Sequence, residues 1–389
     1  MKNSLRPLLI LLVVLSVSGL GFAKEHSTYI LYVGTYTTNG SKGMYAYRYD
    51  EASGALQSLG LAAATENPSF LVADREGLHV FAVNEIENYQ GQSSGGVSAF
   101  TVDRKTWKLA ELNEVASHRA DPAYISLDRS GKYVLVANYT GGNVAVFPIL
   151  QGGKLGEASS VLTDEGQLGP NKKRQESAHA HWIQATAHNH FVYVADLGLD
   201  RVLIYKFDDS KGVLSRGDSS QSDYFSATLA PGTGPRHIAF SADGKFMYVI
   251  GELDSTVTVF ANQANDTYRS IQKISALPAG FSGVNTAAEI GMHPGGKFLY
   301  TSNRGDNSIA EFAVDPASGK LTLLGFVSTQ GKTPRNFAID PTGKRLLVAN
   351  QDSGNIVEYG IASTTGKLSA TGRQVKVPSP VCLIFVAEN

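Results

Sequence analysis

The chain has 389 residues, of which 18% are charged and 42% are hydrophobic, and its formal net charge is −1. Nucleic-acid binding normally needs a basic face, so we expect no nucleic-acid partner. Cys382 is the only cysteine, which excludes an intrachain disulfide and a cysteine metal cluster. This length allows two ordinary domains or one large repeat array.

The N-terminus has the pattern of a secretory signal peptide. Two basic residues precede an apolar run at residues 8–17, and small residues surround Ala23. The run is short for a membrane span, although an uncleaved anchor is the alternative. We therefore expect a signal peptide at 1–23 and an exported domain at 24–389, periplasmic or extracellular, with no membrane attachment after cleavage.

Turn signals recur through the mature chain at a spacing of roughly 50 residues, with one double interval, which is typical of propeller blades. Each repeat contains short β-rich runs separated by turns such as Asp340-Pro341-Thr342-Gly343. The double interval holds one more repeat, with Ala187–His190 as its turn. The six full repeats begin near Asn67, Asp121, Ala178, Gly234, Ala287 and Thr333.

The two ends of the chain supply a seventh repeat. Residues 28–64 contain only three candidate strands, and Pro380–Phe385 lines up with Pro334–Ile339, where other repeats begin. A C-terminal strand that completes this first blade would close the ring and leave no exposed sheet edge. The sequence therefore predicts an all-β, seven-bladed β-propeller whose first blade is closed by the C-terminal strand.

Several conspicuous segments are not expected to carry chemistry. Residues 91–95 match the G-x-S-x-G nucleophile pattern, but they lie in a loop that no helix follows. Residues 152–176 are predicted to be irregular, and within them 171–174 is expected to be a solvated loop. His188 and His190 lie in a turn on the face opposite the predicted site.

One face of the propeller collects the ionisable residues. If the strands of a blade are named A to D from the axis outward, the D-to-A and B-to-C connections share that face. The aligned entry positions of strand A are Phe70, Tyr124, His181, His237, Glu289, Asn336 and Cys382. Arg236 and Arg335 come one residue earlier. The B-to-C connections carry Asn84, Glu85, Asn138, Tyr139, Asp196, Arg201, Glu252, Asn303, Arg304, Asn350 and Gln351.

Clustered ionisable groups at the mouth of a channel indicate a functional site. A structural interpretation competes, because Asn suits turns and arginines form ion pairs between blades. We favour function for Arg236, His237, Glu252 and Arg304, and expect these mouth groups to contribute little to stability.

Metal and cofactor sites are not expected. His179 and His181 could bind a cation, with Glu289 and Asn336 supplying oxygens through the fold, but no third ligand adjoins them in sequence. No P-loop or dinucleotide fingerprint is present.

Several motifs together resemble the seven-bladed propeller lactonase family, which includes propeller-type 6-phosphogluconolactonases and the fungal carboxy-muconate lactonising enzyme. They are Asn138-Tyr139-Thr140-Gly141-Gly142-Asn143, Ala178-His179-Ala180-His181, Gly234-Pro235-Arg236-His237, Ala288-Glu289-Ile290 with His293-Pro294, Ser302-Asn303-Arg304 and Pro334-Arg335-Asn336-Phe337. The resemblance implies opening or closing of a lactone without a metal or organic cofactor. It places the catalytic groups at His181, Arg236, Arg304 and Glu252. Because phosphorylated sugar lactones are cytoplasmic, the predicted signal peptide favours either another kind of lactone or an aldonolactone without phosphate.

Lactone hydrolysis assigns roles to these residues. Glu252 or His181 could be the base for direct attack by water, and Arg236 and Arg304 could stabilise the oxyanion. The residues predicted to bind substrate are His237, Arg335, Glu289, Asn336 and Asn138. Two alternatives remain open: a cycloisomerase that forms a lactone from an unsaturated diacid, and a non-catalytic exported scaffold.

Overall fold

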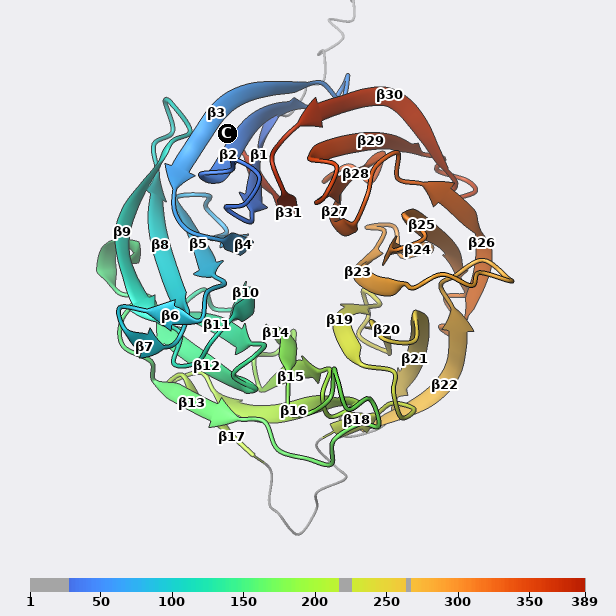
Figure 1. Ribbon diagram of the computed structural model, residues 1–389, viewed down its shortest axis with the longest axis horizontal. Helices are drawn as coiled ribbons and strands as arrows, with labels where there is room; N and C mark the ends of the chain where they lie inside the picture. The colour runs from blue at the N-terminus through green and yellow to red at the C-terminus, as the bar shows by residue number, and fades with distance from the viewer. Residues whose placement is uncertain (1–27, 217–225, 264–266, 389) are drawn as a thin grey trace, which may run out of the picture.

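The computed structural model describes residues 28–216, 226–263 and 267–388, so the predicted signal peptide lies outside the described residues. Within these stretches the strands form seven main sheets around a central axis (Figure 1). The described helical structure is one 3-10 turn, Gln151–Gly153, and none of it is long and apolar enough to cross a membrane. The prediction of an all-β, seven-bladed propeller is confirmed.

Each blade is an antiparallel sheet whose strand A lies nearest the axis (Figure 1). The first blade contains β31 (Pro380–Ala387), β1 (Thr28–Thr35), β2 (Gly43–Asp50) and β3 (Leu56–Ala64). The second contains β4 (Pro68–Ala73), β5 (His79–Asn84), β8 (Gly96–Val102) and β9 (Leu109–Ala116), with the hairpin β6 (Asn88–Tyr89) and β7 (Gln92–Ser93) inserted. The third contains β10 (Pro122–Leu127), β11 (Tyr133–Asn138), β12 (Asn143–Pro148) and β13 (Ser160–Thr163).

The remaining four blades follow in chain order. The fourth contains β14 (Ala180–Ala185), β15 (Phe191–Asp196), β16 (Arg201–Asp208), β17 (Val213–Ser215) and β18 (Ser226–Thr228). The fifth contains β19 (Pro235–Phe240), β20 (Phe246–Gly251), β21 (Thr256–Asn262) and β22 (Tyr268–Ser275). The sixth contains β23 (Thr286–Met292), β24 (Phe298–Arg304), β25 (Ser308–Val314) and β26 (Leu321–Ser328). The seventh contains β27 (Pro334–Ile339), β28 (Arg345–Asn350), β29 (Asn355–Ile361) and β30 (Leu368–Lys376).

The C-terminal strand closes the ring as predicted. β31 pairs antiparallel with β1, and the register runs from Tyr29 opposite Ala387 to Gly34 opposite Cys382. Both ends of the chain thus share one sheet, and an edge that would otherwise lack a partner is hydrogen-bonded.

The A-to-B turns explain the repeated glycines of the sequence. Glycine populates the left-handed region without a Cβ penalty, and asparagine tolerates it better than most residues. In the fourth blade Asn189 takes that position, with φ of 61°. The equivalent glycines, with φ between 63° and 71°, are Gly77, Gly131, Gly244, Gly296 and Gly343.

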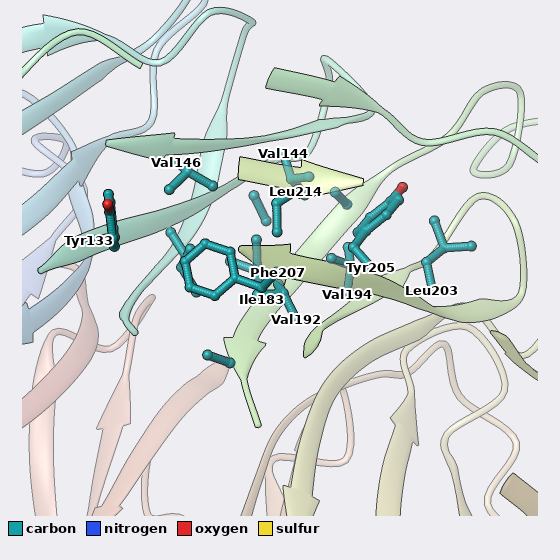
Figure 2. Close-up of a cluster of buried hydrophobic side chains, with 14 of the residues drawn as sticks. Tyr133, Val144, Val146, Ile183, Val192, Val194, Leu203, Tyr205, Phe207 and Leu214 are labelled. Carbon is teal, nitrogen blue, oxygen red and sulfur yellow. The ribbon is translucent and has the colours of Figure 1, made fainter. Parts of the chain in front are cut away.

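The hydrophobic core lies between blades. The buried clusters of the described residues each join two neighbouring blades, and together they go all the way round the ring. Figure 2 shows the cluster between the third and fourth blades, where Tyr133 and Val146 pack with Ile183 and Phe207. Strands B and C are buried on both faces, which is why they read as continuous apolar runs.

Two details differ from the sequence prediction. The segment 152–176 is not wholly irregular, because β13 lies within it and completes the third blade. The outer edge of the fourth blade is divided, since both β17 and β18 pair with β16. Residues 91–95 run from the β6–β7 hairpin to β8, so a strand and not a helix follows them, as expected.

Candidate active site

Two repeated positions of the blades build the site. One is the second residue of strand A, occupied by His181, Arg236 and Arg335 in the fourth, fifth and seventh blades. The other is the residue at or directly after the end of strand B. It is Tyr36, Glu85, Tyr139, Glu252 and Arg304 in the first, second, third, fifth and sixth blades. Ring closure brings both sets to one face.

The strand register corrects the sequence alignment at His181. Ala180 pairs with Asp196 as Pro235 pairs with Gly251, so His181 is equivalent to Arg236 and not to His237. The alignment of the fourth repeat with the others is shifted by one residue, because Ala180 occupies the position where most other blades have proline. His181 therefore faces the mouth as Arg236 does, while His237 is one residue further along its strand.

Glu252 is the centre of the charge cluster. Its carboxylate lies 3.1 Å from Arg236 Nε, 2.8 Å from Arg304 Nη2 and 2.5 Å from Arg174 Nη2. Burial alone would raise its pKa, but the guanidiniums of Arg304, Arg236 and Arg174 lower the pKa of Glu252 to about 2. The carboxylate is ionised at neutral pH, and both its oxygens form ion pairs with guanidiniums.

Arg174 was missed by the sequence analysis. The prediction of a solvated loop at 171–174 is wrong for this residue, because its guanidinium also donates to the Tyr139 hydroxyl at 3.1 Å. The expectation that the mouth groups contribute little to stability assumed that they lie on the surface, whereas the structure largely buries them. The side chains of Arg236 and Glu252 are only 3% and 5% exposed, and that of Arg304 is 11% exposed.

His181 stands beside this cluster with an uncommitted nitrogen. The ring is buried, and its Nδ1 has no hydrogen-bond partner among the described residues. Its centroid lies 5.2 Å from that of His237 and 5.4 Å from that of Tyr139. Burial, together with the charge of Arg236, lowers the pKa of His181 well below its usual value, so the ring is neutral at neutral pH.

His179 is held by the protein. Its Nδ1 lies 3.0 Å from the Tyr139 carbonyl oxygen, its Nε2 lies 3.2 Å from Glu176 Oε1, and its ring stacks on that of Tyr139 at 4.6 Å. Within the part of the chain that the structure describes, no three His, Cys, Asp or Glu side chains are grouped as metal ligands.

Arg335 brings a further cation to the same face. Its guanidinium lies 5.2 Å above the ring of Tyr36 and 3.9 Å from Glu85 Oε1. The Tyr36 hydroxyl donates to the same oxygen of Glu85 at 2.8 Å. This looser arrangement leaves Arg335 more exposed, at 18% of its side chain, than Arg236.

His237, Glu289 and Asn336 form a hydrogen-bonded set. His237 Nδ1 lies 2.9 Å from Glu289 Oε1, and Asn336 Nδ2 donates to Glu289 Oε2 at 2.5 Å. Burial lowers the pKa of His237 to about 4, and Glu289 only partly offsets that effect. All three side chains come from strand A, in the fifth, sixth and seventh blades.

Asn138 is predicted to bind substrate, but the structure gives this contact no support. Its side chain is fully buried, and its amide donates to the Ser117 carbonyl at the end of the preceding blade. Equivalent amides make equivalent bonds in other blades, from Asn84 to Glu66, from Asn303 to Ala276 and from Asn350 to Thr329. These asparagines tie adjacent blades together.

The fold is a seven-bladed propeller, and on one face of it the guanidiniums of Arg174, Arg236 and Arg304 surround the Glu252 carboxylate beside the neutral imidazole of His181. The chain belongs to the seven-bladed β-propeller lactonase family, since the family model "Lactonase, 7-bladed beta-propeller" matches residues 30–385.

The relatives include enzymes with assigned names. The chain is 37% identical to a 6-phosphogluconolactonase of Bacillus subtilis, over 92% of this chain and 98% of that protein. It is 33% identical to a 6-phosphogluconolactonase of Formosa agariphila, over 80% and 86%. Among solved structures, the periplasmic gluconolactonase of Pseudomonas aeruginosa matches with a TM-score of 0.85 and 35% identity, covering 93% of this chain and all of that one.

Proposed function

We propose that the chain hydrolyses a sugar lactone at the mouth formed by His181, Arg236, Arg304 and Glu252. The observation that carries this proposal is the juxtaposition of a neutral imidazole with an uncommitted Nδ1 and a buried group of guanidiniums. Hydrolysis of a cyclic ester needs a base for water and a cation for the oxyanion. Relatives named as lactonases over almost the whole chain support the same reaction.

Arg236 and Arg304 are the proposed oxyanion donors. Both guanidiniums are buried and held on Glu252, so they need little reorganisation as charge develops on the carbonyl oxygen. Glu252 is therefore better suited to fixing the arginines than to taking a proton. A carboxylate whose pKa is about 2 and whose oxygens are both paired is a weak base at neutral pH.

His181 is the proposed base. It takes a proton from water as the water oxygen bonds to the lactone carbonyl carbon, which gives a tetrahedral oxyanion. The bond from that carbon to the ring oxygen then breaks, and the imidazolium returns its proton to the leaving alkoxide. Burial and the charges of Arg236 and Arg335 lower the pKa of His181, and an oxyanion that develops beside Arg236 offsets part of this positive charge when the proton is transferred.

The proposed biological role is that of an exported enzyme that hydrolyses an unphosphorylated aldonolactone. The signal-like N-terminus at 1–23 supports export, and a related structure is that of a periplasmic gluconolactonase. A phosphorylated sugar lactone is cytoplasmic, so the exported protein would meet the unphosphorylated one. Arg335, more exposed than Arg236 and Arg304, is the proposed contact for the substrate's hydroxyl groups.

A comparison of lactones tests the proposal. Purified protein with residues 24–389 should hydrolyse glucono-1,5-lactone faster than the spontaneous reaction, and with higher kcat/KM than 6-phosphogluconolactone. An unsaturated diacid in the same assay tests the cycloisomerase alternative. Absence of any lactone turnover by folded protein would refute the proposed function, and a preference for the phosphorylated lactone would refute the proposed substrate.

A further inference from the structure

A chain of hydrogen bonds runs across four inner strands, from the closing strand to the site. The Leu383 backbone N–H donates to Asn336 Oδ1 at 3.0 Å, and Asn336 Nδ2 donates to Glu289 Oε2 at 2.5 Å. The other oxygen of Glu289 meets His237 Nδ1 at 2.9 Å. The residues belong in turn to β31, β27, β23 and β19, so the chain crosses three boundaries between blades.

The direction of every bond in this chain is fixed. A backbone N–H can only donate, so the Asn336 oxygen faces Leu383 and its amide N–H₂ faces Glu289. Burial opposes ionisation of Glu289, but His237 and Arg236 lower its pKa below the usual value. The carboxylate therefore accepts from both sides, and His237 must carry its proton on Nδ1.

Arg236 is the last residue in this series of hydrogen bonds. Its Nη1 lies 3.3 Å from His237 Nε2, and because a guanidinium has no acceptor, Nε2 must offer its lone pair. Nη1 also donates to the Ala288 carbonyl oxygen at 2.7 Å. These two contacts fix one edge of the guanidinium, while its Nε faces Glu252.

The surroundings of His237 restrict the ring further. Phe70 and Tyr124 meet it edge to face, with centroids 5.8 and 5.1 Å away, and the side chain is 2% exposed. A neutral ring with both nitrogens committed has no proton to give to a substrate. A direct role for it in acid catalysis or substrate contact is therefore disfavoured.

We propose that Glu289 and Asn336 are positioning residues, which hold His237 as a fixed acceptor and thereby orient Arg236 towards the oxyanion. This inference rests on the proposed function for its effect on turnover, though not for its hydrogen-bond geometry. It assigns a role in the site to the closing strand, because the Leu383 N–H sets the orientation of Asn336.

Exchanging the hydrogen-bond donor and acceptor between Glu289 and Asn336 tests this chain of hydrogen bonds. In Glu289→Gln the new amide N–H₂ faces that of Asn336, and in Asn336→Asp two carboxylates face each other, so each single variant contains a mismatch. The double variant E289Q/N336D satisfies every partner again, because the Gln amide donates to the Asp carboxylate, and the Gln oxygen still accepts from His237. Each single variant should lower kcat by about 10²-fold with little change in KM, as misplacement of a catalytic group does. The double variant should recover to within about tenfold of the parent.

The tautomer of His237 provides a readout that needs no substrate. Nitrogen NMR of the parent at pH 7 should show a neutral ring protonated on Nδ1. His293 is an internal control of opposite tautomer, because its Nε2 donates to the Gly343 carbonyl oxygen and its Nδ1 accepts from the Gly295 N–H.

A parent His237 that is charged or protonated on Nε2 would overturn the inference. So would parental kcat in both single variants, or losses in the double variant equal to the product of the single losses. If the parent hydrolyses no lactone, the proposed function fails. The inferred chain of hydrogen bonds is still tested by the tautomer of His237 and by whether the double variant regains the thermal stability that the single variants lose.

Discussion

Arg304 Nη2 lies 2.8 Å from Glu252 Oε2 across the boundary between the fifth and sixth blades. Both side chains are largely buried, and Arg236 and Arg174 contact the same carboxylate. One ion cluster therefore joins blades and also presents the guanidiniums that we propose bind the oxyanion. Stability and catalysis are expected to be coupled at this point.

Glu252→Gln should destabilise the protein as well as lower turnover. Removal of the charge leaves buried guanidiniums without a counter-ion, which typically costs about 3–5 kcal/mol of unfolding free energy. Urea denaturation measures the loss. The control is Glu165→Gln, which removes a surface pair with Arg216 and should cost no more than about 1 kcal/mol. Parental stability in Glu252→Gln would contradict the role of the carboxylate as the centre of the cluster.

Arg304→Ala should reduce kcat by about 10²-fold or more, the typical cost of removing one oxyanion donor. The exposed Arg216→Ala serves as the matched control and should retain parental kinetics. Steady-state assays with glucono-1,5-lactone measure both variants. Similar kinetics in Arg304→Ala and the parent would remove this arginine from the proposed oxyanion site.

Asp196→Asn should change how stability depends on pH. Asp196 occupies the position of the interblade asparagines and faces Asp164. The Tyr205 hydroxyl donates to Asp164 at 2.6 Å, and the backbone N–H groups of His179 and Leu199 donate to Asp196. The remaining oxygens of the two carboxyl groups are buried and need one shared proton to bond each other.

Burial and the neighbouring carboxylate raise the pKa of Asp164 well above its usual value, an effect that the hydrogen bond from Tyr205 and the charge of Arg216 only partly offset. The stabilisation from the shared proton is complete below the unfolded pKa and is lost as pH rises through the raised folded pKa. In Asp196→Asn the amide can donate to Asp164 at any pH. Denaturation between pH 5 and 9 should therefore show a fall in stability for the parent and a smaller one for the variant. Equal slopes would contradict proton sharing.

Truncation before Pro380 should prevent stable folding. β31 supplies the inner strand of the first blade, and the buried Cys382 and Val386 belong to its core with the second blade. Loss of the strand leaves the inner edge of β1 without a partner, although β1 still pairs with β2, and it removes the donor to Asn336. Circular dichroism and thermal melting measure the result, and a truncated chain that melted with the parent would disprove closure by this strand.

The sequence was sufficient for the architecture because the repeats constrain it strongly. Turn glycines mark five of the seven blades, and the match between the segments that begin at Pro334 and Pro380 locates the closing strand. Ring closure then brings Arg236, Glu252 and Arg304 to one mouth, as the spacing predicted.

The spacing of residues in the sequence could not predict the details of the site. Arg174 reaches Glu252 from a long connection whose path no periodicity describes. The register at His181 was off by one because Ala180 replaces a proline, and the burial of Asn138 depends on a bond to the preceding blade. The pKa of Glu252, which argues against its use as a base, follows from three contacts known only in three dimensions.

His181→Asn tests the central claim most directly, with purified protein, glucono-1,5-lactone and a melting curve of the same sample. Loss of the base should lower kcat by about 10²–10⁴-fold. The melting temperature should stay close to the parent value, because Nδ1 of His181 makes no hydrogen bond within the described residues that the change would break. A folded His181→Asn protein with the kcat of the parent would contradict the proposed mechanism.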